Sequence, residues 1–131
     1  RVINDSFDKI FANAPGRIII ATFASLLSRV QQVIDTASRY ERVVALVGRS
    51  MVNNVQMAID LGYLNIPKAM LIRAEDINKF PPERVAIICT GSQGEPTSAL
   101  TRIANQDHRL VRIQKNDTVI LSATPVPGSP R

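Results

Sequence analysis

The sequence has few of the side chains that build metal centres and covalent cross-links. Among 131 residues there is one cysteine, one histidine and no tryptophan. A single cysteine excludes an internal disulfide and favours a reducing cytoplasm. Zinc sites need several His, Cys or carboxylate ligands, so this chain alone cannot supply a His-rich metal centre. Cys89 lies in an apolar segment and is interpreted as a buried, inert thiol.

Long apolar runs are also missing. No segment approaches the ~20 residues that cross a bilayer, and residues 1–11 lack the continuous apolar region of a signal peptide. The sequence therefore predicts no membrane association. Apolar residues make up 45% and charged residues 21%, and 131 residues correspond to one globular domain. The net charge of +5 mildly favours a polyanionic partner such as nucleic acid.

Strand and helix patterns alternate three times along the chain. Three apolar segments lack polar alternation, as expected for strands buried on both faces of a parallel sheet: residues 17–22, 43–47 and 85–89. Each precedes a segment with helical spacing of apolar residues: about 25–39, 51–59 and 96–105. This order predicts an α/β fold, a Rossmann-like and mainly parallel sheet flanked by helices.

The remaining segments give weaker patterns. A helix is predicted at residues 5–12, a short strand at 70–72 and a helical turn at 75–79. Residues 110–113 and 118–122 are predicted to be a closing pair of strands, joined by a turn at Asn116 and Asp117.

The turn from Gly91 to Glu95 is the most informative motif. It follows the third strand, and its glycines let a ligand approach the backbone closely. The helix that opens at Pro96 offers unpaired N–H groups and a partial positive charge, which suit a phosphate. The motif is neither a Walker loop nor a dinucleotide fingerprint. On spacing alone, a strand-to-helix turn without a ligand explains it equally well.

Two other strand ends carry small or hydroxyl residues. Residues 22–25 and 48–50 should lie at the same edge of the sheet, where ligands of parallel α/β folds gather. Arg49 is suited to a phosphate, and equally to a solvated loop. Thr22 and Ser25 are also explained as caps of the next helix. No catalytic residue is predicted, and the candidate phosphate-binding residues are Ser92, Gln93, Gly94, Glu95, Ser25, Arg49 and Ser50.

Several motifs resemble, in order and spacing, the β-CASP domain of the ribonuclease J family. The resemblance covers nearly the whole chain, and its most specific stretch runs from Cys89 to Pro96. The other matching segments are residues 17–25, 29–34, 47–51, 61–64, 99–100, 102–105, 117–120 and 125–128.

The resemblance implies a cytoplasmic, metal-dependent ribonuclease of the metallo-β-lactamase superfamily. Such an enzyme processes RNA as an endonuclease and as a 5′–3′ exonuclease acting from a 5′-monophosphate end. Its β-CASP domain forms one wall of the RNA channel. Two zinc ions bind in the other domain, at a His-x-His-x-Asp-His motif. A homo-oligomer is also implied for the parent protein.

The metal motif of that family is absent here, as are its Ser-Gly-His and His-Gly-Glu segments. We therefore expect residues 1–131 to be a single β-CASP-like domain excised from a larger enzyme. No zinc is expected in this fragment, and no nuclease activity is expected from it alone.

Two other interpretations stay open. The chain is compatible with a stand-alone Rossmann-like module that binds a small phosphorylated ligand at the same turns. It is also compatible with an interaction domain in which Phe7, Ile10 and Phe11 dock on a neighbouring domain or subunit.

Overall fold

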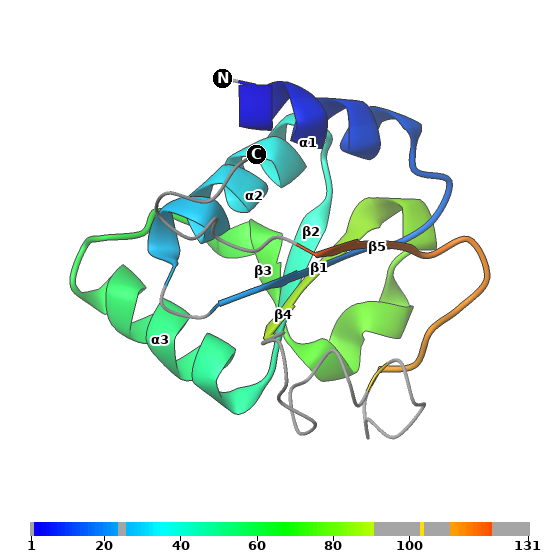
Figure 1. The fold of residues 1–131 in the computed structure, drawn as a ribbon. Helices are drawn as coiled ribbons and strands as arrows, with labels where there is room; N and C mark the ends of the chain where they lie inside the picture. Colours follow the sequence, from blue (N-terminus) through cyan, green and yellow to red (C-terminus); the bar gives the residue numbers. More distant parts are fainter. Residues whose placement is uncertain (1, 24–25, 91–102, 104–110, 122–131) are drawn as a thin grey trace.

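The computed structural model of the chain describes residues 2–23, 26–90, 103 and 111–121 (Figure 1). Three α-helices, three short 3₁₀ helices and five strands lie in these ranges. In chain order they are α1 (Val2–Asn13), β1 (Ile18–Thr22), α2 (Leu27–Arg39), β2 (Val43–Val47), α3 (Arg49–Asp60), η1 (Lys68–Met70), β3 (Leu71–Ile72), η2 (Ala74–Lys79), η3 (Pro82–Arg84), β4 (Val85–Thr90) and β5 (Thr118–Leu121).

The strands form one sheet in the order β3-β2-β4-β1-β5, and every described pairing is parallel. The residues of β1 and β2 are buried along their whole length. Burial on both faces is why these segments are apolar without alternation. The predicted α/β fold with a Rossmann-like, mainly parallel sheet is confirmed.

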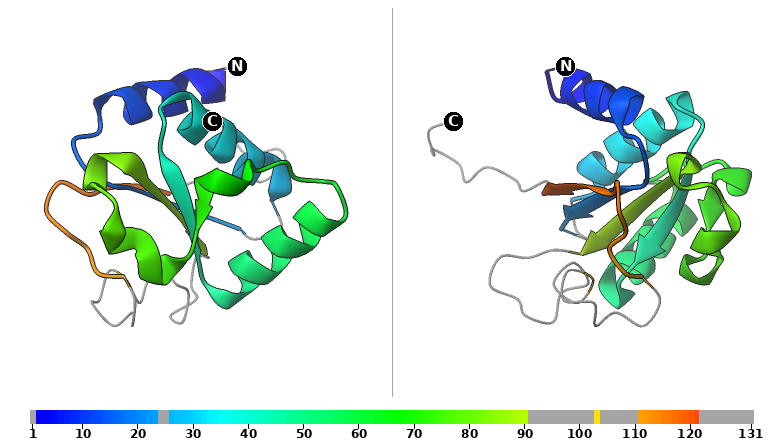
Figure 2. Two further views of the ribbon diagram at one scale, coloured as in Figure 1. Left: turned by 180° about the vertical axis from the view of Figure 1, so that it is seen from behind. Right: turned by 90° about the vertical axis from the view of Figure 1, so that its right-hand side faces the viewer.

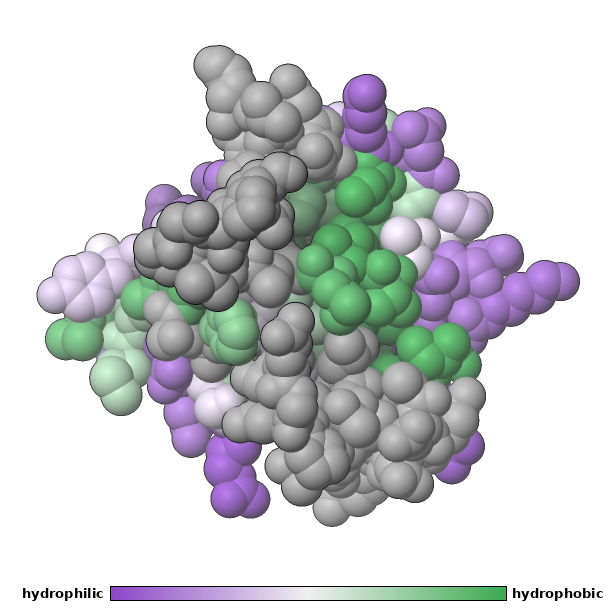
Figure 3. Space-filling view, viewed as in Figure 1, coloured by the Kyte–Doolittle hydropathy of each residue, from purple (hydrophilic) through white to green (hydrophobic). Residues whose placement is uncertain are grey.

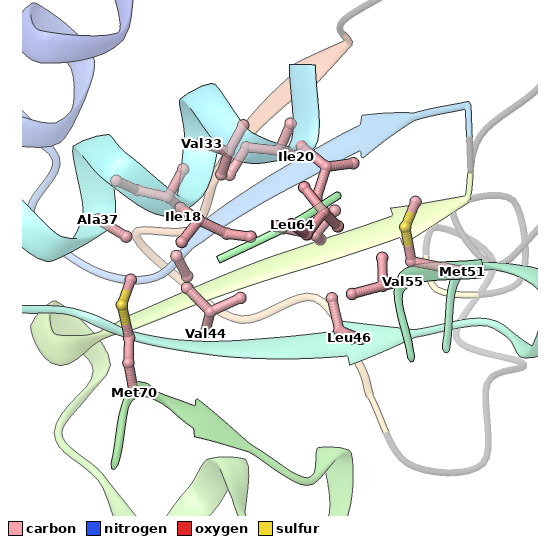
Figure 4. Close-up of a cluster of buried hydrophobic side chains, with 14 of the residues drawn as sticks. Ile18, Ile20, Val33, Ala37, Val44, Leu46, Met51, Val55, Leu64 and Met70 are labelled. Atoms are coloured by element: carbon pink, nitrogen blue, oxygen red, sulfur yellow. The ribbon is translucent and has the colours of Figure 1, made fainter. Parts of the chain in front are cut away.

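Alternate residues of β1, β2 and β4 enter two separate apolar clusters, one on each face of the sheet. Ile20 of β1 joins a cluster with Val33 of α2 and Met51 of α3 (Figure 4). Ile19, its neighbour in β1, packs on the other face with Ile77 of η2. Each fully buried isoleucine or valine contributes about 1.5–3 kcal/mol, so both faces stabilise the sheet.

The connections between strands lie on opposite faces of the sheet according to their direction, as crossovers of one hand require. From β1 to β2 and from β2 to β3 the chain passes through α2 and α3, on the face of the first cluster. From β3 it returns to β4 through η2, on the face of the second cluster. Ile103, between β4 and β5, also packs in the second cluster. The connections that lead from β1 to β3 therefore cover one face of the sheet, and those that lead from β3 to β5 cover the other.

The predicted closing pair of strands is wrong. Val111 to Ile113 has no strand structure, while β5 pairs in parallel with β1 at the end of the sheet. The turn predicted at Asn116 is present, with φ of 73° at that residue. Val111, in the segment predicted as the first strand of the pair, packs into the second cluster instead. Apolar side chains gather near β5 on the face shown in Figure 3.

A buried ion pair fixes β5 beside β1. Arg17 donates from Nε and Nη2 to Asp117, at 3.0 and 2.7 Å. The two side chains are 4% and 2% exposed. Gly16 also permits this approach, because an added Cβ would lie 2.8 Å from the carbonyl oxygen of Asn116.

The first helix packs on the second (Figure 2). Phe7 and Phe11 are buried, and Ile10 is partly buried against the same cluster. An interaction domain that docks through these three residues is therefore wrong, because they already fill the chain's own core. In the described part of the chain, no helix is long and apolar enough to cross a membrane.

Candidate phosphate-binding site

The carboxyl ends of the parallel strands lie at one edge of the sheet, called here the carboxyl edge. At this edge the chain leaves β2 toward β3, and it leaves the neighbouring β4 in the opposite direction, toward β5. A crevice forms where two adjacent strands send their connections apart, and ligands of open α/β sheets bind there. The strand order therefore places the candidate site between the ends of β2 and β4.

One side of the candidate site is the turn between β2 and α3. Gly48 has φ of 108°, a conformation that favours glycine, and it begins α3 without a side-chain cap. Arg49 and Ser50 follow in the first turn of the helix, and both are exposed. The first turn carries no acidic residue, so its N–H groups and partial positive charge are available to an anion.

The other side begins at Thr90, the last residue of β4. Thr90 is paired in register with Thr22 of β1. Gly48 comes directly after the last residue of β2 that pairs with β4. Thr22, Thr90 and Gly48 thus form a row across three strands, about 10 Å long at the usual strand spacing. Small and hydroxyl-bearing residues line the carboxyl edge.

The interpretation of Thr22 as a cap of the next helix does not agree with the structure. Thr22 is the last residue of β1, whereas α2 begins at Leu26 as its N-cap, without a side-chain hydrogen bond. The Thr22 side chain is fully buried, and its Oγ1 has no hydrogen-bond partner. The sequence pattern placed Thr22 at a strand end but gave no sign that its hydroxyl is buried without a partner, because the residues that bury it come from other strands and helices.

Five of the seven predicted site residues lie outside the described residues: Ser92, Gln93, Gly94, Glu95 and Ser25. Arg49 and Ser50 are described, and both lie at the carboxyl edge as predicted. Ile103, in the helix predicted at residues 96–105, is helical and buried.

Cys89 precedes this edge and is fully buried in the second cluster. Burial raises the pKa of its thiol to about 12. A neutral thiol at physiological pH is a poor nucleophile, so the interpretation as an inert core residue is confirmed. Among the described residues, no three His, Cys, Asp or Glu side chains form a group that fits a metal ion. This part of the chain therefore supplies no ligand set for zinc.

Together the fold and the edge define a parallel α/β domain suited to holding an anion. A sequence model of the family described as "Ribonuclease J, beta-CASP domain" matches residues 15–131. The chain therefore belongs to the ribonuclease J family, of which it is the β-CASP domain.

Individual relatives agree with this. The chain is 44% identical to Ribonuclease J of Helicobacter pylori over 127 residues, which is 97% of this chain and 18% of the relative. It is 44% identical to Ribonuclease J2 of Bacillus subtilis over 116 residues, 88% of this chain and 21% of the relative. It is 43% identical to Ribonuclease J of Thermus thermophilus over 127 residues, 97% of this chain and 22% of the relative. The chain thus spans about a fifth of the length of these relatives.

Proposed function

We propose that this domain binds RNA in a cytoplasmic, metal-dependent ribonuclease that acts as a 5′–3′ exonuclease and an endonuclease. The domain forms one wall of the RNA channel, opposite a metallo-β-lactamase domain that holds the zinc ions and cleaves the phosphodiester. The parent enzyme is a homo-oligomer. Membership of the family over residues 15–131 is the observation that carries this proposal.

The carboxyl edge is the part of the domain that would contact RNA. This edge combines the uncapped start of α3 with the exposed Arg49 and Ser50. Arginine, hydroxyl and backbone N–H groups bind phosphate oxygens and position a strand without reading its bases. The low aromatic content of 5% agrees with contacts to the backbone rather than with extensive base stacking.

Arg49→Ala is expected to weaken the binding of single-stranded RNA about three- to tenfold. It removes one cation from the carboxyl edge, so the slope of log affinity against log salt should fall by about 0.7. Fluorescence anisotropy with a labelled oligouridylate, measured at several salt concentrations, gives both quantities.

The matched control is Arg84→Ala. Arg84 is also an exposed arginine, but it lies directly before β4, at the opposite edge of the sheet. This variant makes the same charge change and should leave both quantities near the wild-type values. Equal losses of RNA affinity in the two variants would show that the effect comes from net charge alone. Affinity for a mononucleotide with no affinity for RNA would instead support a stand-alone module for a small phosphorylated ligand.

The 131-residue chain is expected to bind RNA without cleaving it. Family resemblance assigns the metal ligands to the other domain, and the described residues offer no group that fits a metal. Incubation with 5′-monophosphorylated RNA and added zinc or manganese, followed by gel analysis, should leave the RNA intact. Repeated turnover that survives further purification would contradict this division of labour.

A further inference from the structure

Thr22 is the one described residue with a buried side-chain polar atom that lacks a hydrogen-bond partner. Leaving a buried hydroxyl unsatisfied is destabilising, and such groups in native folds call for an explanation. The fold alone does not require this hydroxyl, because valine has nearly the same shape and a strand preference at least as strong. A ligand that accepts a hydrogen bond from Thr22 would explain it.

The surroundings of Thr22 favour an anionic ligand. Thr22 lies two residues after Ile20, so its side chain is on the face that α2 and α3 cover. Both helices begin beside the carboxyl edge without a side-chain cap or an acidic residue in the first turn. Two positive helix ends therefore flank the face on which the free hydroxyl lies.

We propose that the Thr22 hydroxyl positions a phosphate group of bound RNA between the starts of α2 and α3. Thr22 thereby extends the proposed phosphate site from the ends of β2 and β4 to the adjacent strand β1. This inference rests on the proposed function. Thr22 is 0% exposed, so the proposal requires the groups that cover its hydroxyl to move when the phosphate binds.

Thr22→Val tests the inference in the 131-residue chain. Valine removes only the hydroxyl, so RNA affinity should fall about tenfold while the melting temperature stays equal or rises. Thr22→Ser keeps a hydroxyl and should bind within about threefold of wild type. In the wild-type chain, titration with inorganic phosphate should shift the NMR signals of Thr22, a readout that needs no variant.

Thr36→Val is the matched control. Thr36 is also buried, but its Oγ1 donates to the Gln32 carbonyl at 2.8 Å, near the far end of α2. Its loss should lower the melting temperature and leave RNA affinity unchanged.

The probes are two oligouridylates of one length, one with a 5′-phosphate and one with a 5′-hydroxyl. If Thr22→Val loses affinity for both RNAs, the hydroxyl contacts an internal phosphodiester. If it loses affinity only for the RNA with a 5′-phosphate, the hydroxyl contacts the terminal phosphate. Both results support the inference. Wild-type affinity in Thr22→Val would overturn it and leave the proposed function standing. Failure of the wild-type chain to bind either RNA would defeat the proposed function together with this inference.

Discussion

Asp117→Asn is expected to lower the free energy of unfolding by about 3–5 kcal/mol, the usual cost of breaking a buried ion pair from one side. The change leaves the Arg17 guanidinium charged and buried, opposite a neutral amide. The free energy of unfolding of natural domains is about 5–15 kcal/mol, so this loss is a large part of the stability. Denaturation in urea, followed by circular dichroism, measures it.

The geometry explains why this pair is more than a surface contact. Arg17 reaches both carboxylate oxygens of Asp117, and its Nη2 also donates to the carbonyl of Arg112 at 2.6 Å. The backbone N–H of Gln114 donates to Asp117 Oδ2 at 2.8 Å. Thr118, the next residue, donates its N–H to the carbonyl of Arg17 at 2.9 Å, where β5 begins to pair. The pair thus holds the turn and the first residue of the edge strand.

Two comparisons separate the ion pair from other effects. Asp8→Asn makes the same chemical change in the pair with Arg39, whose side chains are 33% and 50% exposed, and should cost less than about 1 kcal/mol. The double variant Arg17→Met with Asp117→Asn removes the stranded charge while the asparagine oxygen still accepts from Gln114. It should recover about half of the loss. A single variant no less stable than Asp8→Asn would show that the buried pair does not fix β5.

Arg42→Met is the second variant with a large expected effect, a loss of about 3 kcal/mol in the free energy of unfolding. Arg42 is a buried arginine, 4% exposed, at the start of β2. Its Nη1 donates to the carbonyls of Gly16 and Val85, at 2.9 and 2.8 Å. Hydrogen bonds from a charged donor contribute about 1.5–3 kcal/mol each, and methionine restores the packing but neither bond.

Arg42 connects segments that come together only in the folded chain. The two carbonyls belong to the segments that begin β1 and β4, and the guanidinium also lies over the Phe11 ring of α1, 5.8 Å from its centre. Burial lowers the pKa of this guanidinium, against the opposing effect of Glu83. One side chain therefore ties α1 and three strand starts at the edge opposite the candidate site.

Arg84→Met provides the control for Arg42. Arg84 is exposed and donates from Nε to one carbonyl, that of Glu41, at 2.6 Å. Its loss should cost under about 1 kcal/mol, because water replaces an exposed hydrogen bond. Arg42→Lys should be destabilised nearly as much as Arg42→Met, because a single ammonium lacks the planar fork of arginine. Urea denaturation of all three variants checks the order, and equal stabilities of Arg42→Met and Arg84→Met would contradict it.

The inner strands could be predicted from the sequence because burial on both faces leaves a local signal. The strand predicted at 43–47 has those bounds, and the strands predicted at 17–22 and 85–89 differ by one residue. The pair predicted at 110–113 and 118–122 failed for the opposite reason. Its turn is local and was found, but the partner of β5 is β1, about 100 residues away. No short pattern encodes such a pairing.

The candidate site divides in the same way. The turn at Arg49 and Ser50 was predictable, because a glycine and a hydroxyl residue between a strand and a helix leave a local pattern. That β2 and β4 are neighbours was not, and this order makes their ends the topological switch point of the sheet. The unsatisfied hydroxyl of Thr22 also appears only when all the groups around it are in place.

The sequence by itself determined the α/β class, the three buried inner strands and the helices that follow the first two, because apolar periodicity reports burial residue by residue. Tertiary structure alone decided the strand order, the parallel edge strand and the position of the candidate site between the ends of β2 and β4. It also decided which arginines are buried against distant carbonyls and carboxylates. Those features depend on contacts between residues far apart in the chain, and such contacts form only when the two apolar clusters close over the sheet.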